Sequence, residues 1–365
     1  MTNDLWTHLA SSSKPIVMYG MGNGADKILK VCDRKGIEIK DFFASDGFVR
    51  GHSFHGKRVL SYSETKEKYG VGNFIVLLSF ASSLPDVIEN IRKIAAESEL
   101  YAPDVPVCGE SLFDAEFYTT HKEEIDAARA LLCDDQSRLV YDSVIAYKLS
   151  GKIEHLTDCN TAPSEAYNEL LHAKEFEITA DLGAYNGDTV RELSAYAPKL
   201  KKAIAFEPDR RNFRKLSEYA EAEEHFEVLP FKLAAWSKKE VLVFGDEGNR
   251  NSGVGSTLVN TKTAKITEVD ADSLDDIVSE KGIRRLDYIK YDVEGSEEEA
   301  LIGSQNSIRA FNPALLVSVY HRSEDIFKLP LIIARDFPNY RLYLRKFRYI
   351  PAWDLNLYAI PNNIL

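Results

Sequence analysis

Short apolar runs alternate with amphipathic stretches in both halves of the sequence, and this alternation limits the possible folds more than any other feature. In the first half the apolar runs occupy residues 15–19, 37–43 and 73–80, and stretches with helical spacing follow them. Strands that alternate with helices of this length are typical of parallel sheets that carry helices on both faces. We therefore expect an α/β protein with two doubly wound, Rossmann-like domains.

The second half shows the same alternation more regularly and predicts the larger of the two sheets. Helical stretches at 188–196, 209–222 and 296–310 separate its strand candidates, and runs at 240–244 and 264–268 suggest an inserted ribbon. The strand candidates are residues 178–182, 202–206, 226–235, 286–291 and 314–320, followed by a closing antiparallel pair at 340–344 and 355–360.

A mainly helical stretch from residue 113 to residue 156 separates the two alternating segments. At 365 residues the chain is more than twice as long as a usual domain. We therefore predict an N-terminal Rossmann-like domain at 1–112, a helical connector at 113–173 and a second domain at 174–365.

Charge and hydropathy argue against several classes of partner. The chain has 45 Lys and Arg against 57 Asp and Glu residues, a net charge of -12, and no basic block that would attract nucleic acid. Its longest apolar runs, such as residues 74–81, cover less than half of a bilayer, and its first residues do not resemble a signal peptide. The four cysteines lack a metal-ligand spacing, which predicts reduced thiols. We expect a soluble, cytoplasmic protein with no membrane span and no nucleic-acid partner.

Polar residues stand where the predicted strands of the second domain end. Ligands of doubly wound sheets bind at the carboxyl ends of the strands, next to the point where the strand order reverses. The side chains at these positions are therefore the candidates for binding and chemistry: Asp181, Glu207, Asp292, Glu294 and His321.

A glycine-bearing loop joins the first strand of this domain to its helix. Asp181 precedes Gly183 by two residues, and Gly187 completes a G-x-x-x-G spacing that differs from the G-x-G-x-x-G of pyrophosphate sites. Free N–H groups at the start of the helix suit a carboxylate, and Asp181 would attract an ammonium or sulfonium group. Glu207 could accept both hydrogen bonds of a ribose diol. These features describe S-adenosylmethionine; the alternative is a helix cap at Asp181 and a solvated Glu207.

Five stretches of the second domain share a wider pattern. They are Ala180-Asp-Leu-Gly-Ala-Tyr-Asn-Gly-Asp-Thr189, Phe206-Glu-Pro-Asp209, Ile289-Lys-Tyr-Asp-Val-Glu-Gly-Ser-Glu297, Val319-Tyr-His321 and Leu357-Tyr-Ala-Ile360. With them, residues 176–361 resemble the FkbM family of class I methyltransferases. The resemblance implies a seven-stranded, mostly parallel sheet. It also implies S-adenosylmethionine-dependent O-methylation, often of a sugar hydroxyl in a glycan or a glycosylated metabolite.

The same resemblance assigns cofactor contacts by position. The methionine end of S-adenosylmethionine would be held by the glycine loop and the ribose by Glu207, and Asp292 would be a further cofactor contact. Trp236 departs from the small-residue pattern of the family, so the adenine contacts stay open. In the glycine loop the residues concerned are Asp181, Gly183, Tyr185, Gly187 and Asp188.

Three residues near the ends of two later strands are candidates for the transfer itself. Asp292 and Glu294 could flank the reacting centre, where one carboxylate polarises the acceptor hydroxyl or both bind a divalent cation. His321 could act as the base, because imidazole titrates near neutral pH. The alternatives are structural roles for Asp292 and His321 and a place for Glu294 at the opening of the next helix. The polar stretch 248–256 could close over the acceptor or be a hairpin loop without function.

The first domain contains a weaker nucleotide-binding pattern. Gly20, Gly22, Gly24 and Ala25 follow an apolar run in the alanine variant of the dinucleotide fingerprint, and Asp46 ends the next strand, where it would suit a ribose. The segment also resembles the small Rossmann-like domains of sugar-modifying and polysaccharide-biosynthesis enzymes. Nucleotide or nucleotide-sugar binding is one interpretation; the other is a scaffold or interaction domain whose glycines allow close packing.

The leading hypothesis is an S-adenosylmethionine-dependent O-methyltransferase that acts on a small-molecule or glycan acceptor. One alternative is an NAD(P)-dependent or nucleotide-sugar-binding protein that acts through the first domain, although the sequence offers no Ser/Tyr-x-x-x-Lys set for hydride transfer. Another is a non-catalytic sensor of adenosyl ligands. His321 and Asp292 count against the sensor, because a sensor needs no acceptor-side base.

Overall fold

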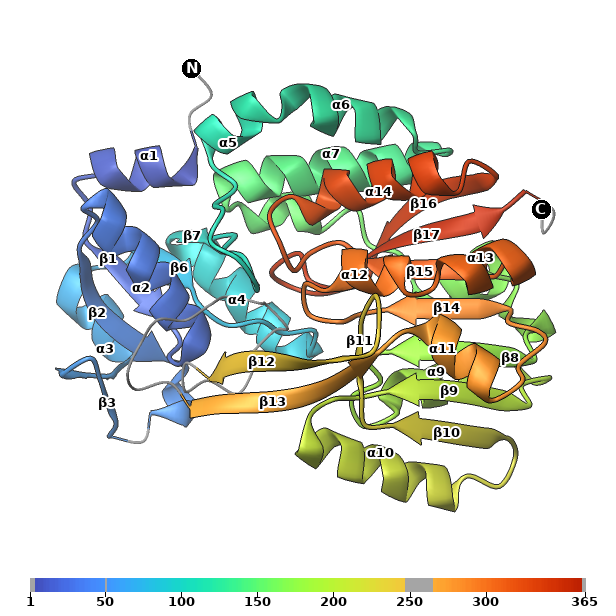
Figure 1. Ribbon diagram of the computed structural model, residues 1–365. Helices are drawn as coiled ribbons and strands as arrows, with labels where there is room; N and C mark the ends of the chain where they lie inside the picture. The colour runs from blue at the N-terminus through green and yellow to red at the C-terminus, as the bar shows by residue number, and fades with distance from the viewer. Residues whose placement is uncertain (1–3, 50, 247–264, 363–365) are drawn as a thin grey trace.

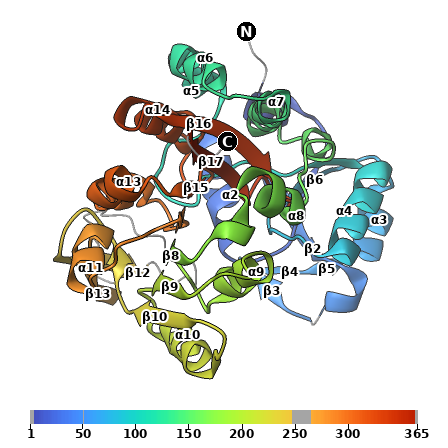
Figure 2. The same cartoon turned by 90° about the vertical axis from the view of Figure 1, so that its right-hand side faces the viewer.

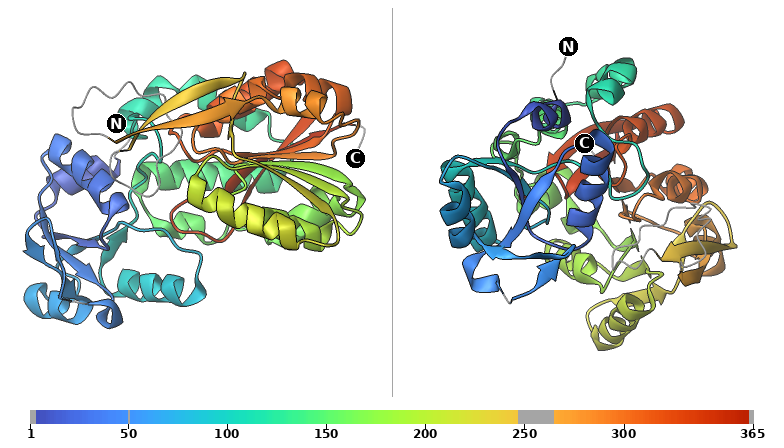
Figure 3. Two further views of the ribbon diagram at one scale, coloured as in Figure 1. Left: turned by 60° about the horizontal axis from the view of Figure 1, so that its bottom comes forward. Right: turned by 90° about the vertical axis from the view of Figure 1, so that its left-hand side faces the viewer.

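The computed structural model describes residues 4–49, 51–246 and 265–362, in which two main β-sheets lie side by side with helices around them (Figure 1). Figure 3 shows the sheet of the first part of the chain, in blue, beside the sheet of the last part, in green to red. The α/β class is thus confirmed. None of the helices in the described ranges combines the length and the apolar character that a membrane crossing requires.

The first sheet contains five parallel strands in the order β5-β2-β1-β6-β7. Its three central strands coincide with the three apolar runs of the sequence and are almost entirely buried, as expected for parallel strands covered on both faces. The elements are α1 (Leu5–Ser11), β1 (Ile16–Tyr19), α2 (Asn23–Lys35), β2 (Ile39–Ala44), a small hairpin of β3 (Ser53–Phe54) and β4 (Lys57–Arg58), β5 (Leu60–Ser61), α3 (Tyr62–Tyr69), β6 (Ile75–Leu78), α4 (Pro85–Glu97) and β7 (Glu99–Tyr101).

The stretch predicted as a helical connector contains the helices α5, α6 and α7, the three-residue helix α8 and the short elements η2, η3 and η4. Helix α6 packs against α14, and α7 packs against β16, so both helices are attached to the last part of the chain (Figure 1). At the second contact the Leu344 N–H donates to Ser137 Oγ over 2.9 Å. The domain boundaries themselves remain predictions. The elements are α5 (Ala115–Thr120), α6 (Lys122–Ala130), α7 (Asp135–Ser150), η2 (Ile153–Leu156), α8 (Pro163–Glu165), η3 (Ala166–Leu170) and η4 (Ala173–Glu175).

The second sheet is a seven-stranded mixed sheet in the order β10-β9-β8-β14-β15-β17-β16. Strands β17 and β16 run antiparallel, as predicted for the closing pair. Helices α8 and α9 lie on one side of this sheet, and α11 and α13 lie on the other (Figure 2). The elements are β8 (Ile178–Leu182), α9 (Asp188–Tyr196), β9 (Lys202–Phe206), α10 (Arg210–Ala222), β10 (Glu227–Phe231), α11 (Leu274–Glu280), β14 (Tyr288–Tyr291), α12 (Glu297–Ile302), α13 (Gln305–Phe311), β15 (Ala314–Ser318), α14 (Asp325–Asp336), β16 (Tyr340–Lys346) and β17 (Leu355–Pro361).

Two of the predicted elements are each divided in the structure. The strand predicted at 226–235 consists of β10 and of β11 (Ala234–Ala235), which belong to different sheets. The helix predicted at 296–310 is divided at Gly303 into α12 and α13. A Cβ atom on Gly303 would lie 2.0 Å from the carbonyl oxygen of Trp236, so only glycine fits this crossing. The spacing of apolar residues in the sequence does not predict this contact between Gly303 and Trp236.

A three-stranded sheet in the order β11-β13-β12 is inserted into the second half of the chain. Strands β12 (Glu240–Asp246) and β13 (Lys265–Asp272) pair antiparallel, which confirms the predicted ribbon. The stretch 248–256, for which a closing movement over the acceptor was one interpretation, lies outside the described residues.

The two main sheets share one hydrophobic core. It joins residues of the first sheet to residues of α7 and of the second sheet, among them Val17, Val76, Tyr141, Val144, Val317 and Leu357. A backbone bridge reinforces this contact, because Ser82 and Ile350 exchange N–H···O bonds of 2.9 and 3.1 Å. The loop after β6 is thereby held beside the turn that joins β16 to β17.

Candidate functional site

Three of the predicted carboxylates meet at one edge of the second sheet. Strand β8 lies between β9 and β14, so Asp181 on β8 lies near Glu207 and Asp292, which directly follow the ends of the two neighbouring strands. Parallel strands end at the same edge, and the strand order reverses on either side of β8 and β14. The strand order thus places these three residues at the same edge of the sheet, and their roles in binding remain predictions.

The glycine loop is closely packed against both neighbouring strands. The N–H groups of Gly183 and Ala184 donate to the Phe206 carbonyl over 3.0 and 2.8 Å. Gly183 has φ +91°, and a Cβ there would lie 2.0 Å from the carbonyl oxygen of Asp292. Gly187 has φ +83° and caps α9. Both glycines are required by the backbone, and they place the start of α9 at the sheet edge.

Two other loop residues face outward. Tyr185 has a left-handed backbone, with φ +47°, and 46% of its surface is exposed. Asp188 is exposed at the first turn of α9, where it accepts a hydrogen bond from the Thr189 N–H over 2.9 Å. Both side chains are accessible to a ligand at this edge.

Asp181 is buried beneath this loop. Its carboxylate accepts a hydrogen bond from the Thr189 hydroxyl and lies 3.4 Å from Lys290 Nζ. Burial raises the pKa of Asp181 above its ordinary value, although the charge of Lys290 opposes that change. The carboxylate is therefore a fixed part of the site and is not solvated.

Glu207 is also buried, with 6% of its surface exposed. One of its oxygens accepts a hydrogen bond from the Asp209 N–H over 2.8 Å. Burial raises the pKa of Glu207 to about 7, against the hydrogen bonds that favour its ionised form. This burial argues against the alternative of a solvated Glu207.

Asp292 is surrounded by donors. The Tyr320 hydroxyl donates to it over 3.0 Å, Lys290 Nζ lies at 3.3 Å, and His321 Nε2 lies at 3.5 Å. Burial alone would raise the pKa of Asp292, but the charges of Lys290 and His321 lower it to about 2. Asp292 is thus an ionised and fully engaged carboxylate at neutral pH.

His321 follows β15 and is almost completely buried. Its Nδ1 lies 2.8 Å from Glu297 Oε1, and its Nε2 faces Asp292. Burial would lower the pKa of His321, but Glu297 and then Asp292 raise it to about 9. A base role for His321 stays a prediction, and it would require the imidazolium to lose its proton before it could take one.

Glu294 stands in the loop between β14 and α12 with a left-handed backbone, φ +55°. Its Oε2 is buried without a hydrogen-bond partner, and burial raises the pKa of Glu294. Its carbonyl accepts a hydrogen bond from Cys108 Sγ over 2.8 Å. The first part of the chain therefore contacts this loop directly.

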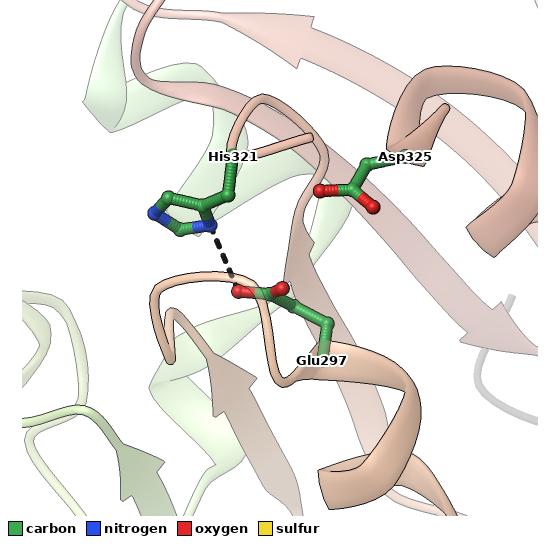
Figure 4. Close-up of side chains that lie close together, drawn as sticks. All are labelled: Glu297, His321 and Asp325. Atoms are coloured by element: carbon green, nitrogen blue, oxygen red, sulfur yellow. Dashed lines mark ion pairs between the residues drawn. The ribbon is translucent and has the colours of Figure 1, made fainter. Parts of the chain in front are cut away.

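One group of side chains in the described ranges has the composition of a metal site. Glu297, His321 and Asp325 each place a ligand atom within 4.8 Å of the other two (Figure 4). Glu297 Oε1 also accepts the Val293 N–H over 3.1 Å, and Asp325 accepts the Arg322 N–H over 2.7 Å. The group differs from the predicted cation pair of Asp292 and Glu294, and its present contacts already form a buried ion pair.

The glycines of the first sheet serve close packing. A Cβ on Gly24 would lie 2.1 Å from the Ser79 carbonyl oxygen, and one on Gly20 would lie 2.6 Å from the Phe80 ring, whereas Gly22 faces open space. The hydroxyl and the N–H of Ser63 both donate to Asp46. These contacts favour the packing interpretation, and nucleotide binding by Gly20, Gly22, Gly24 and Asp46 remains a prediction.

Sequence reasoning missed Lys290 and Glu297. Lys290 lies within the buried strand β14. Because a lysine is rarely buried unless it is paired, its position in an apolar run could have indicated a buried ion pair. Glu297 begins α12, where an acidic residue is ordinary, so nothing in the sequence distinguishes it.

Comparisons with known proteins agree with this arrangement. Residues 181–351 match the methyltransferase FkbM domain. The crystal structure of methyltransferase FkbM from Methylobacillus flagellatus KT is 18% identical and aligns with 95% of this chain and 90% of its own at a TM-score of 0.68. Fibrillarin from Aeropyrum pernix, solved with natively bound S-adenosyl-L-methionine, is 15% identical and aligns over 52% of this chain and 68% of its own at a TM-score of 0.32. No curated protein sequence matches the chain.

The M. flagellatus protein shares the fold over nearly the whole chain, which includes the sheet that precedes residue 181. The fibrillarin alignment is too weak to support an argument. The family match covers the glycine loop, the loop after β14 and the residues around His321. Residues 181–351 are thus similar to the methyltransferase FkbM domain, and the fold is similar to that of the M. flagellatus protein.

Proposed function

We propose that the protein is an S-adenosylmethionine-dependent O-methyltransferase whose acceptor hydroxyl belongs to a sugar, a glycan or a glycosylated metabolite. The observation that carries the proposal is the meeting of Asp181, Glu207 and Asp292 around a glycine loop at the edge of the second sheet. The acceptor class comes from the family resemblance alone.

The residues present fit this methyl donor. The buried Glu207 carboxylate stands after the second strand, where it can accept the two hydroxyl groups of a ribose. The exposed start of α9 at Asp188 can bind the carboxylate end, because its first N–H groups carry a partial positive charge. The ionised Asp292 can attract the sulfonium and ammonium charges.

For methyl transfer the main task of the protein is to align the acceptor oxygen with the methyl group of the donor. When bound, the donor supplies an activated methyl group. The chain must place an acceptor oxygen in line with it, exclude water and accept one proton. The closely packed loop at Gly183 and the paired Asp292 are rigid groups on which such an alignment can be built.

Calorimetric titration with S-adenosylhomocysteine, with NAD and NADP in parallel, tests the proposal. The wild-type protein should bind S-adenosylhomocysteine. Glu207→Gln should weaken binding by about tenfold or more, because a charged acceptor of the ribose hydroxyls is lost. Glu218→Gln, an exposed position on α10, is the matched control and should bind as the wild type does.

Each possible result has a different meaning. Binding of NAD alone would transfer the function to the first sheet and exclude the methyltransferase proposal. Unchanged affinity in Glu207→Gln would remove the ribose assignment. Labelled methyl groups from S-adenosylmethionine should then appear as ethers on hydroxylated acceptors, and transfer to nitrogen or carbon would contradict O-methylation.

A further inference from the structure

A cavity of about 490 Å³ lies next to Asp292 on the α9 side of the second sheet. This volume is typical of sites for small molecules. Lys290 and Asp292 form its floor, and Thr189 and Glu192 of α9 form one wall. The cavity therefore adjoins the edge where the proposed methyl donor would bind.

Three distant parts of the chain complete the cavity. Ser83 comes from the loop after β6 of the first sheet, Asn160 and Thr161 precede α8, and Asp354 and Asn356 belong to the end of the β16–β17 turn and the start of β17. Backbone bonds hold these parts together. The Ser82–Ile350 bridge connects the first to the third, and the Thr161 N–H donates to the Lys346 carbonyl over 2.8 Å. Backbone hydrogen bonds therefore fix the three parts of the chain that line the cavity relative to one another.

One buried hydroxyl group in the lining of this cavity has no hydrogen-bond partner within the described part of the protein. Thr161 is 95% buried, because only 5% of its surface is exposed, yet its Oγ1 has no hydrogen-bond partner. Buried hydroxyls are normally hydrogen-bonded, since leaving one unpaired forfeits the hydrogen bonds that it makes with water in the unfolded chain. A polar ligand in the cavity would supply the missing partner.

The second group is the half-buried Asp354. Its backbone is left-handed, with φ +56°, a conformation that Asp and Asn adopt more readily than most other residues with a side chain. Within the described residues its carbonyl accepts the Phe347 N–H, but its carboxylate has neither a hydrogen bond nor an ion pair. The charged groups that act on it are Asp292, Lys290, Lys346 and Asp188.

The other two candidate bases are less available. Asp292 lines the cavity but is already engaged by Tyr320 and Lys290. His321 is not part of the cavity lining, and its Nδ1 lies 2.8 Å from Glu297 Oε1. Burial and then the neighbouring Asp292 raise the pKa of Asp354, which strengthens it as a proton acceptor.

Building on the proposed methyl transfer, we propose that this cavity is the acceptor site, that it takes an uncharged molecule with several hydroxyl groups, and that Asp354 accepts the proton of the hydroxyl that is methylated. The lining combines the neutral polar groups of Ser83, Thr161 and Asn356 with charges of both signs, from Glu192, Lys290, Asp292, Arg348 and Asp354. Such a mixed lining can donate to and accept from several hydroxyl groups, and its charges of opposite sign do not favour a ligand of either net charge. Through Ser83, in the loop after β6, the N-terminal part of the chain would take part in acceptor recognition.

The atoms balance in a single displacement. A lone pair of the acceptor oxygen forms the new bond to the methyl carbon, while the bond from that carbon to sulfur breaks and leaves its electron pair on sulfur. The oxygen loses its proton to the carboxylate of Asp354, which returns it to water after the product leaves.

Binding of methyl glycosides tests the site without relying on turnover. We would titrate the full-length protein, saturated with S-adenosylhomocysteine, with the methyl glycosides of glucose, mannose, galactose and rhamnose and follow binding by saturation-transfer NMR. At least one should bind. Thr161→Val and Asp354→Asn should each weaken that binding by about tenfold, while Asp336→Asn on α14 serves as the control and should not.

Both variants should fold. Valine has the shape of threonine and removes an unpaired hydroxyl, and asparagine tolerates the left-handed backbone at residue 354. In assays with the glycoside that binds, Asp354→Asn should lower kcat by about a hundredfold with a smaller change in KM.

The outcomes separate this proposal from the one on which it rests. A wild-type protein that does not bind S-adenosylhomocysteine contradicts the methyltransferase proposal itself. If it binds S-adenosylhomocysteine but none of the glycosides, or if both variants bind glycoside as the wild type does, the acceptor site is wrong. Normal turnover by Asp354→Asn would exclude it as the base.

Discussion

The carboxyl groups of Asp292 and Glu207, both at the edge of the second sheet, differ in pKa because their neighbours differ. Asp292 faces Lys290 and His321 and has a pKa of about 2, whereas Glu207 is buried with few positive neighbours and has a pKa of about 7. Sites often use such a separation to keep one carboxylate ionised and to let another titrate near neutral pH.

The pKa of Glu207 predicts how ligand affinity changes with pH. Below pH 7 the side chain is a neutral acid and cannot accept both ribose hydroxyl groups; above pH 7 it is ionised and can. Affinity for S-adenosylhomocysteine should therefore increase by roughly tenfold from pH 6 to pH 8. Calorimetry at a series of pH values measures this, and Glu207→Gln should bind weakly with a flat profile. A flat profile in the wild type would contradict the assignment.

The buried pair of His321 and Glu297 predicts a stability effect. Glu297→Gln removes the negative charge beside a buried imidazolium and should lower the free energy of unfolding by about 3 kcal/mol. Urea denaturation measures this loss. Glu298→Gln is a matched control in the next position, where an exposed pair with Lys328 is lost, and it should change stability by about 0.5 kcal/mol or less. Equal effects in both variants would show that the buried pair has no special role.

Sequence patterns identified Asp181, Glu207 and Asp292 because each stands at or directly after the end of an apolar run, and strand ends meet at one edge. They could not reveal that His321 lies against Glu297, since that contact joins the loop after β15 to the start of α12 through tertiary packing. Asp354 was missed for the same reason, because it lies in a turn without periodicity and its charged neighbours, such as Asp292 and Lys290, come from other elements of the fold.

At the scale of elements, strand positions were predictable because buried parallel strands form continuous apolar runs. The antiparallel pair and the inserted ribbon were also predictable from their patterns. The break between α12 and α13 was not, because it depends on the contact of Gly303 with Trp236. Short strands such as β5, β7 and β11 contain too few residues to show a pattern.

The glycine loop supplies a prediction at this scale. Gly183→Ala would force a Cβ against the Asp292 carbonyl and should separate β8 from β14, which lowers the free energy of unfolding by about 3 kcal/mol or more. Gly282→Ala also has positive φ but meets open space, so it should cost only about 1 kcal/mol. Chemical denaturation of both variants measures the difference. Similar losses would mean that backbone conformation alone, and not the close approach, requires glycine at 183.

At the scale of the whole molecule, the predicted domain boundary at residue 174 can be tested by truncation. Helices α6 and α7 cover α14 and β16, so a chain of residues 174–365 would expose the apolar surface that they bury. This fragment should lack the cooperative thermal transition that near-ultraviolet circular dichroism shows for the full chain. A fragment that unfolds cooperatively and binds S-adenosylhomocysteine normally would show that residues 174–365 form an independent domain.

The bridge between Ser82 and Ile350 has a consequence for the order of folding during synthesis. Residue 350 leaves the ribosome long after residue 82, so the first sheet can form early, but the loop after β6 must wait for its partner. Contacts between such distant positions form slowly, because a long loop must close before they do. In a nascent chain the first sheet would therefore be complete well before the cavity next to Asp292 is complete.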